Sequence, residues 1–69
     1  MIYEIEVGRT YYSPSGLPFK VLRKGVKYAL DCSVFMVVFT NLVPTHDRPG
    51  GEEWVLDELL FMKIYREEL

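Results

Sequence analysis

The sequence predicts a mainly β protein, built as a small barrel or a strongly bent antiparallel sheet of about five strands. Residues 34–42 form a run that is apolar at all but two positions and rich in β-branched and aromatic side chains. A run of this kind is typical of a central strand that packs on both faces. Residues 2–7 alternate apolar and acidic side chains, and turn-forming residues separate the other extended pieces.

The N-terminal part is predicted to contain one strand and one tight turn. Residues 2–7 form the strand, because their apolar side chains recur at every second position between glutamates. Gly8 interrupts this pattern, and residues 9–12 continue as a short extended piece. Residues 13–16, with the sequence Ser-Pro-Ser-Gly, have the composition of a tight turn and reverse the chain.

The middle of the chain is predicted to lead into the central strand. Residues 19–23 and 26–30 are two extended pieces, and the Lys24-Gly25 step between them is a hairpin turn or a bulge. Residues 31–33 are expected to turn, after which residues 34–42 form the centre of the sheet.

The C-terminal part begins with an exposed loop. Residues 43–51 contain two prolines and two glycines and cannot continue a sheet. Residues 53–56 are predicted to be a strand, Asp57 to cap a single helical turn through Phe61, and residues 62–65 to form a closing strand.

An alternative for the tail is a sheet followed by a C-terminal helix. Residues 52–69 are largely good helix formers, and Val55, Leu59 and Met62 would share one face of such a helix. Both interpretations of the tail stay open at the level of sequence.

The length and composition predict one domain, residues 1–69. A chain of this size buries only about 60% of the surface that its unfolded form exposes, so a partner or a second copy would add stability. The hydrophobic share of 49% and the aromatic share of 14% support a compact core. The single cysteine, Cys32, excludes an internal disulfide and is typical of a reducing compartment. We see neither a signal peptide nor a membrane-spanning run, and therefore expect a cytoplasmic protein without membrane association.

The charge balance disfavours binding to nucleic acid. Eight Lys and Arg residues stand against ten Asp and Glu residues, giving a net charge of −2. Proteins that bind nucleic acid draw most of their affinity from basic side chains that neutralise phosphates. Arg23, Lys24 and Lys27 are the one local basic group that would serve such a function.

Residues with catalytic or metal-binding chemistry are too few for a site. His46 and Asp47 are adjacent, but a triad also needs a nucleophile within hydrogen-bonding reach of the histidine. One histidine and one cysteine are too few ligands for zinc, and Gly50-Gly51 does not open a phosphate-binding pattern. We therefore expect a protein that is not an enzyme and has no cofactor or metal.

Aromatic side chains are the best candidates for a binding site. Tyrosine and tryptophan are effective anchors at protein interfaces because they combine a large apolar ring with a polar group. We predict a groove around Tyr11, Tyr12 and Trp54, completed by His46 and Arg48 from the loop at residues 43–51.

A series of residues spread through the chain resembles one known family. The positions are Gly8, Tyr12, Gly16, residues 19–22, 36–39, 41–42 and 54–55, Glu58 and Phe61. Their order is similar to that of the small bacterial family catalogued as domain of unknown function 1653. The resemblance implies a compact module similar to the SH3-like barrels, with no catalytic assignment. The chain departs from the family pattern at residues 11–14, which replace a basic segment, at Leu56, which stands in place of an arginine, and in its longer loop.

The predicted function is that of a non-enzymatic module that binds a protein partner through the aromatic groove. The first alternative is a small nucleic-acid-binding barrel, in which aromatic rings stack on bases. A second alternative is a phage-type protein that binds a host factor. Self-association to a homodimer is a further expectation, because an unpaired edge at residues 2–7 would pair with its copy.

Overall fold

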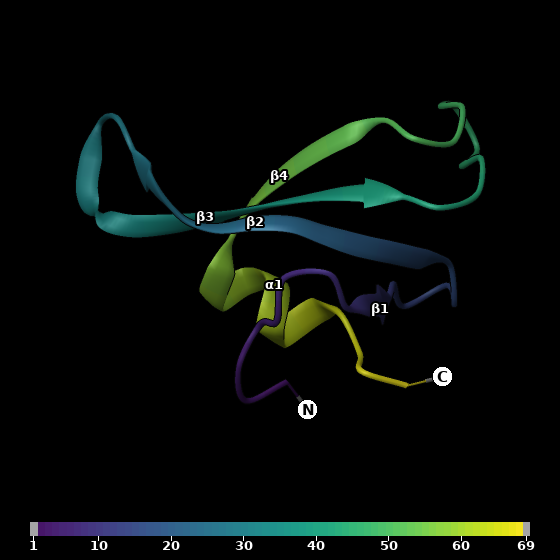
Figure 1. Cartoon of the computed structure of the whole chain (residues 1–69), viewed down its shortest axis with the longest axis horizontal. Coiled ribbons are helices and arrows are strands. Elements are labelled where there is room, and N and C mark those ends of the chain that lie inside the picture. The colour runs from purple at the N-terminus through teal and green to yellow at the C-terminus, as the bar shows by residue number, and fades with distance from the viewer. Residues whose placement is uncertain (1, 69) are drawn as a thin grey trace.

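The computed structural model describes residues 2–68 as four strands followed by one short helix (Figure 1). The elements are β1 (Thr10–Tyr12), β2 (Pro18–Tyr28), β3 (Asp31–Asn41), β4 (Glu53–Asp57) and α1 (Glu58–Ile64). Each strand pairs antiparallel with the next, in the order β1-β2-β3-β4. Within the described residues β1 and β4 do not pair, so the sheet is open. The prediction of a mainly β fold with a small antiparallel sheet is confirmed, with four strands in place of about five, and the short C-terminal helix matches the alternative of a sheet followed by a helix.

Residues 2–7 form no strand, so the prediction of a first strand here is wrong. Ile2 and Ile5 are buried, whereas Tyr3 and Val7 are 88% and 57% exposed. The buried positions are thus three residues apart. In a strand, residues three apart point to opposite faces, so a strand could not bury both on the same face. The segment crosses the helix side of the sheet as an irregular strap, and the strand edge that was expected to pair with a second copy does not exist.

The two extended pieces predicted at residues 19–23 and 26–30 join in one strand, β2, which ends at Tyr28, two residues earlier than predicted. The pairing with β3 shifts register between Arg23 and Val26, so the Lys24-Gly25 step is a bulge, one of the two predicted alternatives. Gly25 has a φ of +69°, a conformation that residues with a Cβ rarely adopt.

The predicted turn at residues 31–33 lies inside β3 instead. The chain reverses at residues 29–30, and Asp31 already pairs with Tyr28. The turn-forming chemistry is nevertheless present, because Ser33 N donates to Asp31 Oδ1 at 3.0 Å and Ser33 Oγ to the same oxygen at 2.6 Å. These bonds accompany another register shift, between Lys27 and Tyr28, so the local signal produces an irregularity within a strand.

Residues 34–41 of the apolar run lie in β3, an inner strand between β2 and β4 as predicted, and Leu42 follows the end of the strand. Three consecutive residues, Val37, Val38 and Phe39, are buried, so both faces of the strand are covered over this stretch. Coverage ends toward the hairpin, where Phe35 is 44% exposed. Burial is therefore concentrated in the C-terminal half of the strand, where Asn41 at its end is buried as well.

The tail combines the two interpretations drawn from the sequence. Asp57 caps α1 as predicted, since its side chain accepts hydrogen bonds from Leu59 N and Leu60 N. The helix continues to Ile64, so the closing strand predicted at residues 62–65 is wrong. The helix also begins only after β4, which accounts for Val55 lying in a strand.

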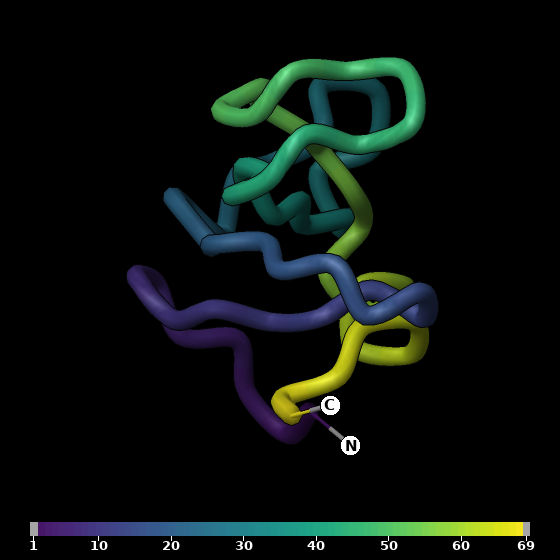
Figure 2. The backbone as a smooth tube through the Cα atoms, turned by 90° about the vertical axis from the view of Figure 1, so that its right-hand side faces the viewer, coloured from purple at the N-terminus to yellow at the C-terminus, as the bar shows by residue number. Residues whose placement is uncertain are grey.

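Aromatic rings form most of the core between the sheet and α1. Phe61 from the helix lies edge-on to Tyr11 at 5.5 Å between ring centroids and contacts Phe39 at 5.0 Å. Tyr65 stacks on Phe61 with centroids 4.3 Å apart and contacts Phe19 at 5.5 Å. Both terminal segments run along this same end of the molecule (Figure 2).

Candidate functional site

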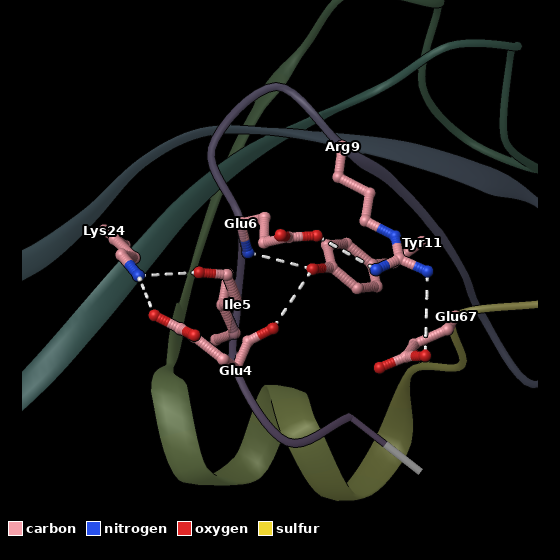
Figure 3. A network of polar contacts seen from close by, with 7 residues as sticks. All are labelled: Glu4, Ile5, Glu6, Arg9, Tyr11, Lys24 and Glu67. Carbon is pink, nitrogen blue, oxygen red and sulfur yellow. Dashed lines mark hydrogen bonds and ion pairs between the residues drawn. The ribbon is translucent and has the colours of Figure 1, made fainter.

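Tyr11 lies inside the core and offers no surface to a partner. Its side chain is fully buried. Its hydroxyl accepts a hydrogen bond from Glu6 N at 2.9 Å and donates to the carbonyl of Glu4 at 3.4 Å (Figure 3). Tyr11 therefore fastens the N-terminal strap to β1, a structural role in place of the predicted place in a groove.

The side chains of Tyr12 and Trp54 project from opposite faces of the sheet. Cross-strand pairing places Trp54 beside Phe39, on the face that packs against α1. The same face carries Tyr11, and neighbouring residues in a strand alternate between faces, so Tyr12 points to the other side. The structure does not bring these two half-buried rings together in one groove.

Asn41 holds Trp54 in place and is the polar residue that sequence reasoning missed. Asn41 is 1% exposed, and its Oδ1 accepts hydrogen bonds from Trp54 Nε1 at 3.1 Å and from Glu52 N at 3.0 Å. Its Nδ2 donates to the carbonyls of Val43 at 2.9 Å and Pro49 at 2.8 Å. One buried amide thus satisfies four partners and joins β3, β4 and the loop. The signal for it was an asparagine inside an otherwise apolar run.

The loop at residues 43–51 presents His46 and Arg48 to solvent. Asn41 anchors both ends of the loop, and a hydrogen bond from Thr45 N to Arg48 O, 2.9 Å long, closes it internally. Both candidate side chains are therefore accessible on an anchored loop, at the end of β3 where Trp54 is also held.

Several basic side chains form ion pairs with acidic side chains of the same chain. Lys24 Nζ donates to the carbonyl of Ile5 at 2.7 Å and lies 3.6 Å from Glu4 Oε1 (Figure 3). Arg23 lies 3.6 Å from Glu53 across the sheet. Two members of the local basic group are thus engaged within the chain.

Arg9 joins the strap to the C-terminal segment. Its guanidinium lies 2.9 Å from Glu6 and 3.6 Å from Glu67 (Figure 3). The hydrogen bond with Glu6 raises the pKa of Arg9 above its ordinary value, and the charge of Glu67 adds to this effect. The guanidinium is therefore charged and acts as a surface clamp.

The far half of the β2–β3 hairpin forms an apolar projection, which we call the arm and define as residues 24–36. The arm extends beyond α1 and β4 (Figure 1). β1 pairs only with residues 18–20, and the pairing of β4 reaches the arm only at Met36. The start of α1 contacts the arm where Gly25 N donates to the side chain of Glu58. Its exposed large apolar side chains are Val26, Tyr28, Leu30 and Phe35.

We searched the described residues for a metal-binding cluster and for a membrane-spanning helix. Among residues 2–68, no three His, Cys, Asp or Glu side chains gather where they would hold a metal ion. No helix in that part of the chain is long and apolar enough to cross a membrane.

Comparisons with protein-family models, with curated proteins and with solved structures return no match for this chain. The resemblance to domain of unknown function 1653 therefore stays a prediction. Any functional conclusion rests on the chain's own residues.

Proposed function

We propose that the chain is a non-enzymatic module that binds a protein partner, and that the arm is its main contact surface. The observation that supports this proposal is the group of exposed apolar side chains on the arm. Phe35 pairs with Lys27, so its ring lies on the opposite face of the arm from Val26 and Tyr28, and both faces carry exposed apolar side chains. Exposed apolar side chains gathered on one projection of a small protein mark a site of interaction.

The physics of an isolated hairpin supports the same proposal. A two-stranded hairpin without a third strand or a packed helix is marginally stable in water. Tyr28 and Phe35 supply aromatic rings of the type that dominates binding energy at interfaces. A partner that covers them removes apolar area from water and stabilises the arm at the same time.

The setting of this activity is proposed from the sequence. The single exposed Cys32 is consistent with a reducing compartment, and a cytoplasmic location is part of the proposal. A phage-type protein that binds a host factor would act in this way. Nucleic-acid binding is less well supported, because Arg23 and Lys24 lie close to carboxylates of the same chain.

The test compares variants of three surfaces in affinity capture from a host lysate, with and without nuclease. A Tyr28→Ser/Phe35→Ser variant should lose a partner that the wild type retains under nuclease. Tyr12→Ala and a Val55→Ser control should keep it, because Val55 is an exposed apolar residue outside the arm.

Each other outcome overturns part of the proposal. Loss of the partner on Tyr12→Ala or His46→Ala, with the arm variant unaffected, would move the contact to the surfaces predicted from the sequence. Capture that nuclease abolishes would replace a protein partner with nucleic acid. The near-ultraviolet circular dichroism of each variant verifies that its aromatic core is intact.

A further inference from the structure

A hollow of about 580 Å³ lies between the N-terminal strap and the end of α1. Residues 2–3 form one wall and residues 62–66 form the other. Its volume falls in the range of about 300–1,000 Å³ that is usual for sites that bind small molecules. It shares no residue with the arm or with the loop at residues 43–51.

The walls of the hollow are mainly apolar and aromatic. Ile2 is buried at its base, and Met62 and Ile64 come from α1. Tyr3 and Tyr65 contribute rings, and the ring of Tyr65 is held by its stacking on Phe61. This lining suits a flat or elongated apolar body.

The charged groups of the hollow are all basic. Lys63 and Arg66 line it, and no carboxylate side chain does. Neither of them forms an ion pair within residues 2–68, whereas Arg9, Arg23 and Lys24 all do. Lys63 and Arg66 thus bring two cations to one hollow in a chain whose net charge is −2, although Glu67 and Glu68 follow Arg66 in the sequence.

The backbone fixes the position from which Arg66 reaches the hollow. Tyr12 N donates to Arg66 O and Arg66 N donates to Tyr12 O, each at 2.8 Å. Lys63 lies in the last turn of α1, where a cation also offsets the partial negative charge of the carbonyl groups. That role accounts for Lys63 alone, since Arg66 follows the helix.

We propose that this hollow binds an anionic group carried on an apolar or aromatic body. Lys63 and Arg66 would contact the anion, and the apolar wall with the tyrosine rings would cover the body. Carboxylates, sulfonates and phosphates share this chemistry. The site is independent of the arm, so either proposal can fail without the other.

Two fluorescent probes with the same ring system test the proposal. The first, 8-anilinonaphthalene-1-sulfonate, carries an anion, and the second, N-phenyl-1-naphthylamine, is its neutral counterpart. We expect the sulfonate to bind the wild type with one site per chain. A Lys63→Gln/Arg66→Gln variant should weaken sulfonate binding by roughly five- to tenfold and leave the neutral probe unchanged.

Control variants separate charge at this hollow from charge in general. Lys27→Gln removes an exposed cation of the arm and should leave both probes unaffected. Tyr3→Ser removes a ring that is mostly in solvent and should weaken both probes to a similar extent. Thermal unfolding of each variant is needed as a control because partly unfolded chains also bind the sulfonate.

The wild type provides a second measurement that needs no variant. Raising the NaCl concentration from about 20 mM to about 500 mM should weaken binding of the sulfonate several-fold, because salt screens the cations. Binding of the neutral probe should change little. Displacement by dodecanoate or by phenyl phosphate then distinguishes a lipid-like carboxylate from a phosphate. Equal salt dependence of the two probes, equal weakening by Lys27→Gln, or many sulfonate molecules per chain would overturn the proposal.

Discussion

The two halves of the β2–β3 hairpin have similar composition but different surroundings. Near the core, Phe19 and Phe39 pack among other aromatic rings and are buried. On the arm, Tyr28 and Phe35 belong to the same two strands and are almost half exposed. The difference comes from their neighbours, because β1, β4 and α1 cover the core half and contact the arm only at Gly25 and Met36. An apolar strand sequence therefore indicates the capacity for burial, and the presence of neighbouring strands and a helix decides whether burial occurs.

The largest expected effect is at the centre of the covered half. Phe61→Ala should destabilise the fold by about 3–5 kcal/mol, because it removes a fully buried ring and leaves a cavity among three other aromatic residues. A domain of this size has a total stability of only about 3–10 kcal/mol, so the variant would be largely unfolded at 37 °C. Urea denaturation measures this loss.

Leu59→Ala is the matched control for Phe61→Ala, because Leu59 lies in the same helix and is 71% exposed. Its cost should stay below about 1 kcal/mol. Equal costs for the two variants would contradict the contrast between covered and uncovered positions.

The second largest loss of stability is expected at Asn41, which holds the loop at residues 43–51 at the end of β3. Asn41→Ala should cost about 2–3 kcal/mol, because two carbonyls, the Glu52 N–H and the Trp54 indole N–H lose their partner. Trp54→Phe removes one of these bonds and should cost less. Faster hydrogen exchange of the Glu52 amide in Asn41→Ala would identify release of the loop as the cause, and unchanged exchange would refute it.

The third effect is seen only at alkaline pH. Burial raises the pKa of Tyr65 above its usual value of 10, because the phenolate form is disfavoured inside the aromatic cluster. Its contribution is therefore fully present below pH 10 and is lost as the pH rises through the raised pKa. Tyr65→Phe should lose less stability than the wild type between about pH 9 and about pH 11. Tyr3→Phe, at an exposed position, should behave as the wild type does.

The smallest effect on stability is expected on the arm. Phe35→Ser should cost at most about 1 kcal/mol, because its side chain is already 44% exposed in the folded chain. Val37→Ser, two residues further along β3 and fully buried, should cost several times as much. Similar costs at both positions would show that the arm is covered in solution, for example by a second copy, and measuring them over a range of protein concentrations would detect this.

Local chemistry in the sequence predicts several elements of the fold. The apolar run of β3, the bulge at Lys24-Gly25 and the cap by Asp57 each depend on residue types that act over a few positions. Residues 2–7 show where such reasoning fails. Their alternation is that of a strand, but Ile2 and Ile5 are drawn to the core by α1, which lies far along the sequence.

The candidate site was less predictable than the fold. The sequence identifies Tyr11, Tyr12 and Trp54 as aromatic residues. It does not specify from which face of the sheet each side chain projects. That depends on pairing register, which places Tyr11 with the core and Tyr12 on the opposite face. The exposure of the arm depends on where β4 ends, a property of the whole sheet that no local pattern reports.

The bond between Asp31 and Ser33 has a consequence for solubility. Residues 32–34 lie in a stretch of β3 where the pairing with β2 is irregular and β4 is absent, so their backbone groups would offer a template to strands of other molecules. The side chain of Asp31 accepts a hydrogen bond from one of these groups, the N–H of Ser33, and adds a negative charge to the arm. The hydrogen bonds from Ser33 also lower the pKa of Asp31, so this charge persists into mildly acidic solution. Asp31 therefore has the position and the charge of a gatekeeper residue, the kind that disfavours fibril formation at exposed strand edges.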